Sequence, residues 1–232
     1  MKLTRPAAAG RSNLITRRSI LRAGLTIAGT SALTFFAGNG TAAAAQSTGR
    51  RGTATRSLNG WPVVADAPLQ PIDGSNAAVR LTDGAPAILL GYVARRYNYE
   101  IETLEKDDLR GFSANAVLTE EYESTYRSGT GMTIRAEAYP LGVAGGFYPT
   151  ELIVIRDILA ELDGAVAWGG DYLTPKESHF HIARRPGDPA LERTAIRIAS
   201  AGTGAPFAPG VVDAFVPARR AASQAFERES RR

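Results

Sequence analysis

Trp168-Gly169-Gly170-Asp171, followed further along by His179-Phe180-His181, is the stretch that says most about the fold of this 232-residue chain. Short apolar or alternating runs at 165–168 and 178–183 predict two strands. Neighbouring side chains on a strand point to opposite faces, so His179 and His181 share one face and both imidazoles could contact one metal ion. The alternative is a pair of histidines on a half-exposed strand, because two ligands do not complete a tetrahedral zinc site.

The segments on either side of these strands have the periodicity of one α+β domain over residues 58–200. Apolar side chains at helical spacing predict helices over 85–97 and 150–162, the second with Thr150 as its cap and Asp163-Gly164 as its end. A third helix is expected from Asp188-Pro189 to about Ile198. Alternation of apolar and polar residues over 97–104 predicts a further strand. The sequence has no internal repeat, Gly-rich phosphate loop or Gly-x-Ser-x-Gly elbow.

Composition excludes several kinds of site. The chain has no cysteine, so it has no disulfide framework, no cysteine-bound zinc and no thiol nucleophile. It has only two histidines, which limits any histidine-based metal site. Hydrophobic content of 44% and charged content of 22% are typical of a globular chain.

The first 45 residues have the features of an export signal. Residues 1–22 contain six basic side chains and no acidic one, and 23–38 is uncharged and moderately apolar. Thr16-Arg17-Arg18-Ser19-Ile20-Leu21-Arg22 closely resembles the twin-arginine export consensus, and Ala43-Ala44-Ala45 suits a signal peptidase. We therefore expect export through the twin-arginine translocase to an extracellular or wall-associated location. The alternative is an uncleaved anchor, but the apolar run is short and weak for a stable membrane span.

Removal of residues 1–45 changes the interpretation of the net charge. The whole chain carries +4, whereas the remainder has 21 basic and 23 acidic residues, a net charge of −2. That balance does not favour a nucleic-acid partner. Residues 46–57 are polar and aperiodic and are expected to form a linker. Residues 201–232 are expected to be a flexible Pro/Gly joint and an Arg-rich tail, helical from about Val211 to Glu227.

The Trp-Gly-Gly-Asp and His-Phe pair resembles the C-terminal signature of the D-alanyl-D-alanine carboxypeptidase and L-alanyl-D-glutamate peptidase family. These are VanY-like zinc peptidases that cut peptidoglycan stem peptides. The resemblance extends through 124–142, with its Tyr139-Pro140-Leu141-Gly142 run, and the helix at 150–162. Asn59-Gly60-Trp61-Pro62-Val63 is similar to the family's opening segment. The resemblance implies a small antiparallel sheet flanked by helices, the Hedgehog/DD-peptidase-like fold, with zinc on the sheet.

The zinc motif of the family is degenerate in this chain. Active members carry Ser-x-His-x-x-Gly-x-Ala-x-Asp, in which the His and the Asp are ligands; here Ser124 and Gly129 match, but those two positions hold Tyr126 and Thr133. The third ligand corresponds to His179. The general base, an acid three residues before it, falls on Lys176, while Glu177 is one residue late and is the remaining candidate base. An ammonium group cannot accept a proton, so the resemblance implies that two of three ligands and the base are lost.

Three functions follow as hypotheses. The first is an inactive peptidase-like domain that uses no cofactor and binds peptidoglycan peptides or a cell-wall protein. The second is an active D,D- or L,D-peptidase with a rebuilt zinc site formed by His179, His181 and a third, unaligned ligand, for which Asp171 and Glu177 are candidates. The third is a domain unrelated to the wall, because fold does not determine function. For the first, the residues expected to form a carboxylate-binding groove, or to be solvated surface on a decayed site, are Ser124, Tyr126, Arg127, Thr133, Arg135, Trp168, Asp171 and Lys176.

Overall fold

The computed structural model describes residues 55–201 and 212–230, which fall within one compact unit of the chain. The expected export signal, most of the expected linker and the expected Pro/Gly joint lie outside the described residues. None of the described helices is long and apolar enough to cross a membrane.

A four-stranded antiparallel sheet forms the centre of the domain, in the order β3-β4-β6-β5. Its strands are β3 (Leu109–Arg110), β4 (Gly131–Ile134), β5 (Val166–Trp168) and β6 (His179–Ile182). A separate antiparallel pair joins β1 (Leu69–Pro71) to β2 (Ala78–Arg80). The α+β class with small antiparallel sheets and flanking helices is therefore confirmed, as are the two strands expected on either side of the Trp-Gly-Gly-Asp turn.

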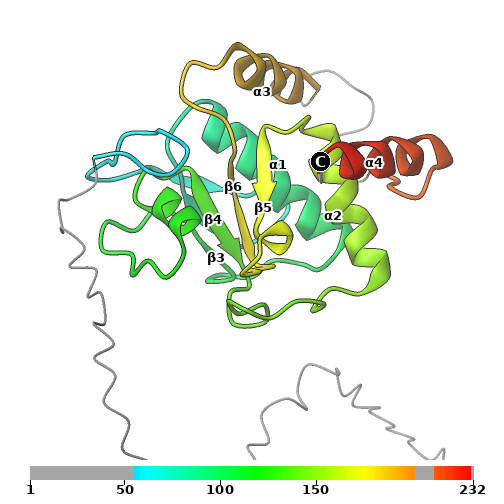
Figure 1. Ribbon diagram of the computed structural model, residues 1–232, viewed down its shortest axis with the longest axis horizontal. Helices are drawn as coiled ribbons and strands as arrows, with labels where there is room; N and C mark the ends of the chain where they lie inside the picture. The colour runs from blue at the N-terminus through cyan, green and yellow to red at the C-terminus, as the bar shows by residue number, and fades with distance from the viewer. Residues whose placement is uncertain (1–54, 202–211, 231–232) are drawn as a thin grey trace, which may run out of the picture. The chain divides into compact units, whose positions relative to one another are not determined.

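Helices α1 (Ala85–Glu100) and α2 (Pro149–Glu161) cover one face of the sheet, with α3 (Pro189–Ala201) against α1 and α4 (Pro217–Ser230) against α2 (Figure 1). Phe180 and Ile182 of β6 are fully buried in the core beneath them. The opposite face of the sheet is covered by η2 (Glu121–Tyr126), a 3₁₀ helix, and a one-turn helix, η3 (Gly169–Asp171), follows β5. One face of β6 is therefore apolar and packs into the core, and the other face carries the two histidines.

Two expectations about the helices were wrong. The segment expected to form a strand over 97–104 instead continues α1 to Glu100, because Tyr97 lies on the same buried helical face as Val93. The second helix begins at Pro149 and not after Thr150. Proline suits the first helical position, and the Glu151 carboxylate accepts a hydrogen bond from the Tyr148 amide at 2.8 Å. The third helix begins at Pro189, as expected.

A buried ionic network ties α4 to the rest of the domain. Arg96 on α1 is fully buried and forms ion pairs with Glu100, Asp157 and Glu161. Arg219 on α4 donates to both oxygens of Asp157 at 2.9 and 2.7 Å, so Asp157 joins the two arginines. A buried charge requires such partners, and this network places α4 firmly on α2.

Candidate functional site

The two histidines lie side by side on β6 and face η2. His179 is fully buried and His181 is 3% exposed. In the strand register Thr133 of β4 lies opposite His179, and Gly131 lies opposite His181. Residues directly opposite one another in an antiparallel pair project to the same face, so this face carries both imidazoles and the Thr133 side chain. The strand is buried and not half-exposed.

A chain of four polar side chains runs through this face. The Tyr126 hydroxyl lies 2.6 Å from His179 Nδ1, His179 Nε2 lies 3.0 Å from His181 Nδ1, and His181 Nε2 lies 3.2 Å from the Tyr172 hydroxyl. Each imidazole therefore has a partner on both ring nitrogens. With both rings neutral, every group can be satisfied when all the hydrogen bonds run in one direction along the chain. Each neutral ring then donates through one nitrogen and accepts through the other.

Burial sets the protonation states of these four side chains. It lowers the pKa of His179 well below the ordinary value, and the nearby His181 and the positive charge of Lys176 lower it further. Burial also lowers the pKa of His181, to about 4. In the same way it raises the pKa of the Tyr126 hydroxyl and brings the pKa of Tyr172 to about 12. All four groups are therefore neutral at pH 7.

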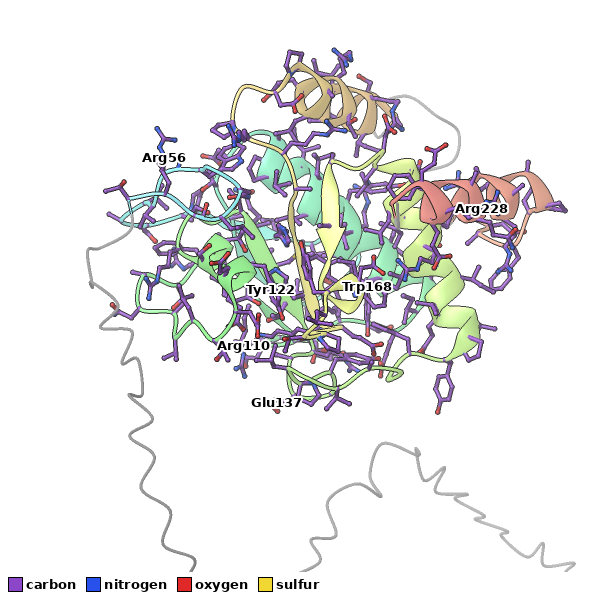
Figure 2. All side chains as sticks on the ribbon, viewed as in Figure 1. Arg56, Arg110, Tyr122, Glu137, Trp168 and Arg228 are labelled. Atoms are coloured by element: carbon purple, nitrogen blue, oxygen red, sulfur yellow. The ribbon has the colours of Figure 1, made fainter. Side chains whose placement is uncertain are left out.

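Aromatic rings enclose the histidines. Tyr122 stacks on Tyr172 with ring centroids 4.7 Å apart, and its centroid lies 4.9 Å from that of His179 (Figure 2, where Tyr122 is labelled). The Tyr122 hydroxyl donates to the Thr174 carbonyl at 3.0 Å. Glycine is needed at position 131, because a Cβ there would lie 2.2 Å from the Thr125 hydroxyl oxygen. The face is thus closely packed around the imidazoles.

Lys176 occupies the position that the resemblance assigns to a general base, and it is paired. Its ammonium donates to Glu123 Oε1 at 2.7 Å and lies 5.3 Å from the Tyr126 ring centroid. Burial raises the pKa of Glu123, but hydrogen bonds from Lys176 and from the amides of Thr119 and Glu120 outweigh burial, so the pKa falls below its usual value. Glu123 is therefore a carboxylate at neutral pH, and it already pairs with the lysine.

Three other residues expected in a binding groove have partners elsewhere. Arg135 leaves β4 with a left-handed backbone (φ 51°) and pairs with Glu102 and Asp108, away from the histidine face. Arg127 donates to the Ala116 carbonyl at 2.7 Å. The Ser124 hydroxyl donates to the Glu121 carbonyl and accepts from the Leu58 amide. The structure therefore brings Tyr126, Thr133 and Lys176 to the histidines, but not these two arginines.

The residues of the Trp-Gly-Gly-Asp turn have structural contacts. Trp168 is 3% exposed, and its indole N–H donates to the Glu177 carbonyl at 2.7 Å. Both Asp171 oxygens accept from Arg156, at 2.7 and 2.6 Å. The Glu177 carboxylate accepts from the consecutive amides of Gly145 and Gly146, each at 2.7 Å. Neither carboxylate is directed at the histidine pair.

A hydrolytic zinc site needs three protein ligands and an open position for water. Within residues 55–201 and 212–230, no group of three or more His, Cys, Asp or Glu side chains could hold a metal ion. The histidine pair is joined to two neutral phenols, which are poor zinc donors, and each of its nitrogens already has a hydrogen-bond partner. The residues present do not fit catalytic zinc.

Sequence reasoning missed three members of this cluster, Tyr122, Glu123 and Tyr172. The only local sign of Glu123 was its position in the Glu121-Tyr122-Glu123 run, where alternating acids and an aromatic precede Tyr126 by a few residues. Tyr172 directly follows the Trp-Gly-Gly-Asp turn. The contacts of Glu123 with Lys176 and of Tyr122 with Tyr172 join segments about fifty residues apart, which no short-range pattern reports, whereas Tyr172 contacts His181 nine residues further along the chain.

Comparison with known proteins identified no relative of this chain. No family model, curated protein or solved structure matches the chain.

Proposed function

We propose that this chain is exported through the twin-arginine pathway and acts at the cell wall as a peptidase-like protein that does not hydrolyse peptides. Its domain binds peptidoglycan peptides or a wall-associated protein. The proposal combines the family resemblance of the sequence with a histidine face that holds no complete metal site among the described residues.

The hydrogen bond between Tyr126 and His179 is the observation that carries the proposal. Tyr126, Thr133 and His179 are the three positions that the resemblance assigns to zinc ligands. Tyr126 lies 2.6 Å from His179, and Thr133 lies opposite it in the strand register. Their convergence supports the alignment on which the resemblance rests. A phenol in place of one ligand, with its hydroxyl engaged to another, supports the loss of the metal.

The electrostatics also argue against peptide hydrolysis. An activated water requires a group that can accept its proton. Lys176 donates to Glu123, and hydrogen bonds to Glu123 from Lys176 and from the Thr119 and Glu120 amides keep Glu123 a carboxylate. The two imidazoles are neutral but are enclosed and fully hydrogen-bonded. The described site thus offers no free base to a water molecule.

The test uses the purified full chain in three measurements. Metal analysis should find much less than one zinc per chain, and incubation with muropeptides should leave them intact. Co-sedimentation with insoluble peptidoglycan should retain the chain in the pellet. Near-stoichiometric zinc with muropeptide cleavage would establish the rebuilt peptidase instead. A chain that stays in solution beside peptidoglycan and wall extracts would support a domain unrelated to the wall.

A further inference from the structure

A groove with one apolar wall and one polar wall lies between α2 and α4, which pack side by side (Figure 1). It has a cavity volume of about 310 Å³. The apolar wall is formed by Pro149, Leu152 and Ile153 of α2. Leu152 and Ile153 are only partly buried, although both pack against the core. None of the residues of the tyrosine–histidine chain lines the groove, so it is a separate surface.

The polar wall of the groove is one face of α4. It is formed by Arg220, Ser223, Gln224 and Glu227, whose spacing of three, four and seven residues places them in one row along the helix. The side chain of Arg220 forms no hydrogen bond or ion pair within the described part of the chain. Glu227 Oε1 lies 3.4 Å from Arg156 Nε, and the Glu227 side chain is still 29% exposed. The row therefore has a cation at one end and a carboxylate at the other.

This row of charges is complementary to a copy of itself. A two-fold axis passing between positions 223 and 224 makes two α4 helices antiparallel, because residues 220 and 227 are equally far from that axis. Arg220 of each copy then lies opposite Glu227 of the other copy, as a self-complementary interface requires. A carboxylate can accept hydrogen bonds from more than one donor, so the pairing of Glu227 with Arg156 is compatible with a second arginine.

We propose that the groove between α2 and α4 is a dimer interface, and that its occupant is a second copy of this chain with its α4 antiparallel to the first. Pairing of the two copies covers the exposed parts of Leu152 and Ile153, which gives the interface an apolar centre with charged pairs at its rim. A second copy satisfies both ends of the row with the same two residues, whereas an unrelated partner needs the opposite row of charges. The inference does not depend on wall binding.

The test is sedimentation velocity of the purified full chain over a range of concentrations. The unaltered chain should show a monomer–dimer equilibrium. Arg220→Glu and Glu227→Arg should each weaken the dimer by at least about tenfold, because each change creates two like-charge contacts per dimer. An equimolar mixture of the two single variants should dimerise again, since each contact then joins opposite charges. The double variant Arg220→Glu/Glu227→Arg should dimerise for the same reason.

Arg228→Glu is the matched control, since Arg228 is exposed on α4 and does not line the groove (Figure 2, where Arg228 is labelled). It should dimerise as the unaltered chain does. Circular dichroism checks that each variant is folded, which matters most for Glu227→Arg because that change also removes the partner of Arg156. An unaltered chain that stays monomeric, a dimer insensitive to Arg220→Glu, or a mixture of folded single variants that stays monomeric would overturn the inference.

Discussion

His179 Nε2 and His181 Nδ1 lie 3.0 Å apart on one face of β6, and each ring is also hydrogen-bonded to a tyrosine. The arrangement uses all four imidazole nitrogens within the protein. The spacing of the two histidines would suit a shared metal ion. In this structure they instead form the middle of a buried row of four hydrogen-bonded side chains.

The stability of the domain should fall as the pH drops below about 6.5, the pKa of an unfolded histidine. The folded pKa of His181 is about 4 and that of His179 is also lowered, so between those values the unfolded chain binds protons that the folded chain does not. Each such proton costs about 1.4 kcal/mol per pH unit. Urea unfolding between pH 7 and pH 5 measures the slope. A His179→Asn/His181→Asn variant should lose the slope, and an equally flat profile in the unaltered chain would contradict the prediction.

Tyr126→Phe should lower the free energy of unfolding by about 1–3 kcal/mol, because it leaves a buried nitrogen of His179 without a partner. Tyr99→Phe is the control, since the Tyr99 side chain is half-exposed, and it should change stability by less than about 0.5 kcal/mol. Chemical denaturation of both variants provides the measurement. Equal stability of the two would mean that the hydroxyl of Tyr126 contributes nothing.

Lys176→Met should destabilise the domain by about 3 kcal/mol, because Glu123 would remain as a nearly buried charge without its cation. Adding Glu123→Gln should restore much of the loss, since the uncompensated charge is then removed. Denaturation of the single and double variants forms a double-mutant cycle. A double variant no more stable than Lys176→Met would show that the pair is not coupled.

Introducing the zinc ligands of the peptidase family that the sequence resembles should create a metal site. Tyr126→His with Thr133→Asp would place an imidazole and a carboxylate beside His179, and the chain should then retain about one zinc after dialysis. The matched control adds His179→Ala to the same two changes and should retain none. Circular dichroism checks that both variants are folded. Absence of zinc in a folded double variant would show that the three positions do not form a ligand set.

Export should depend on the arginine pair near the N-terminus. A fusion of residues 1–45 to a folded reporter should appear outside the cytoplasmic membrane, and Arg17→Lys/Arg18→Lys should keep it in the cell. Arg5→Lys/Arg11→Lys preserves charge in the same way outside the consensus and should leave export intact. Export of all three fusions, or of none, would contradict the twin-arginine assignment.

Much of the secondary structure could be predicted from periodicity. The helices near 85, 150 and 189 and the strands around Trp168 and His179 are present, because each pattern buries one side of its own segment. The strand expected over 97–104 was wrong because Tyr97 and Ile101 fit both periods. Burial against the core decided for the helix as far as Glu100. The first residue of α2 was harder to predict, because Pro149 begins the helix while the Glu151 carboxylate accepts a hydrogen bond from the Tyr148 amide.

Sequence by itself determined the α+β class and the placement of both histidines on one strand face. Only the tertiary structure decided which charged groups remain available. Lys176 is neutralised by Glu123, which lies about fifty residues away along the chain, and Arg135 turns toward Glu102 and Asp108. Whether a charge is free depends on long-range packing, because electrostatic pairing requires approach within a few ångströms and no local pattern records that approach.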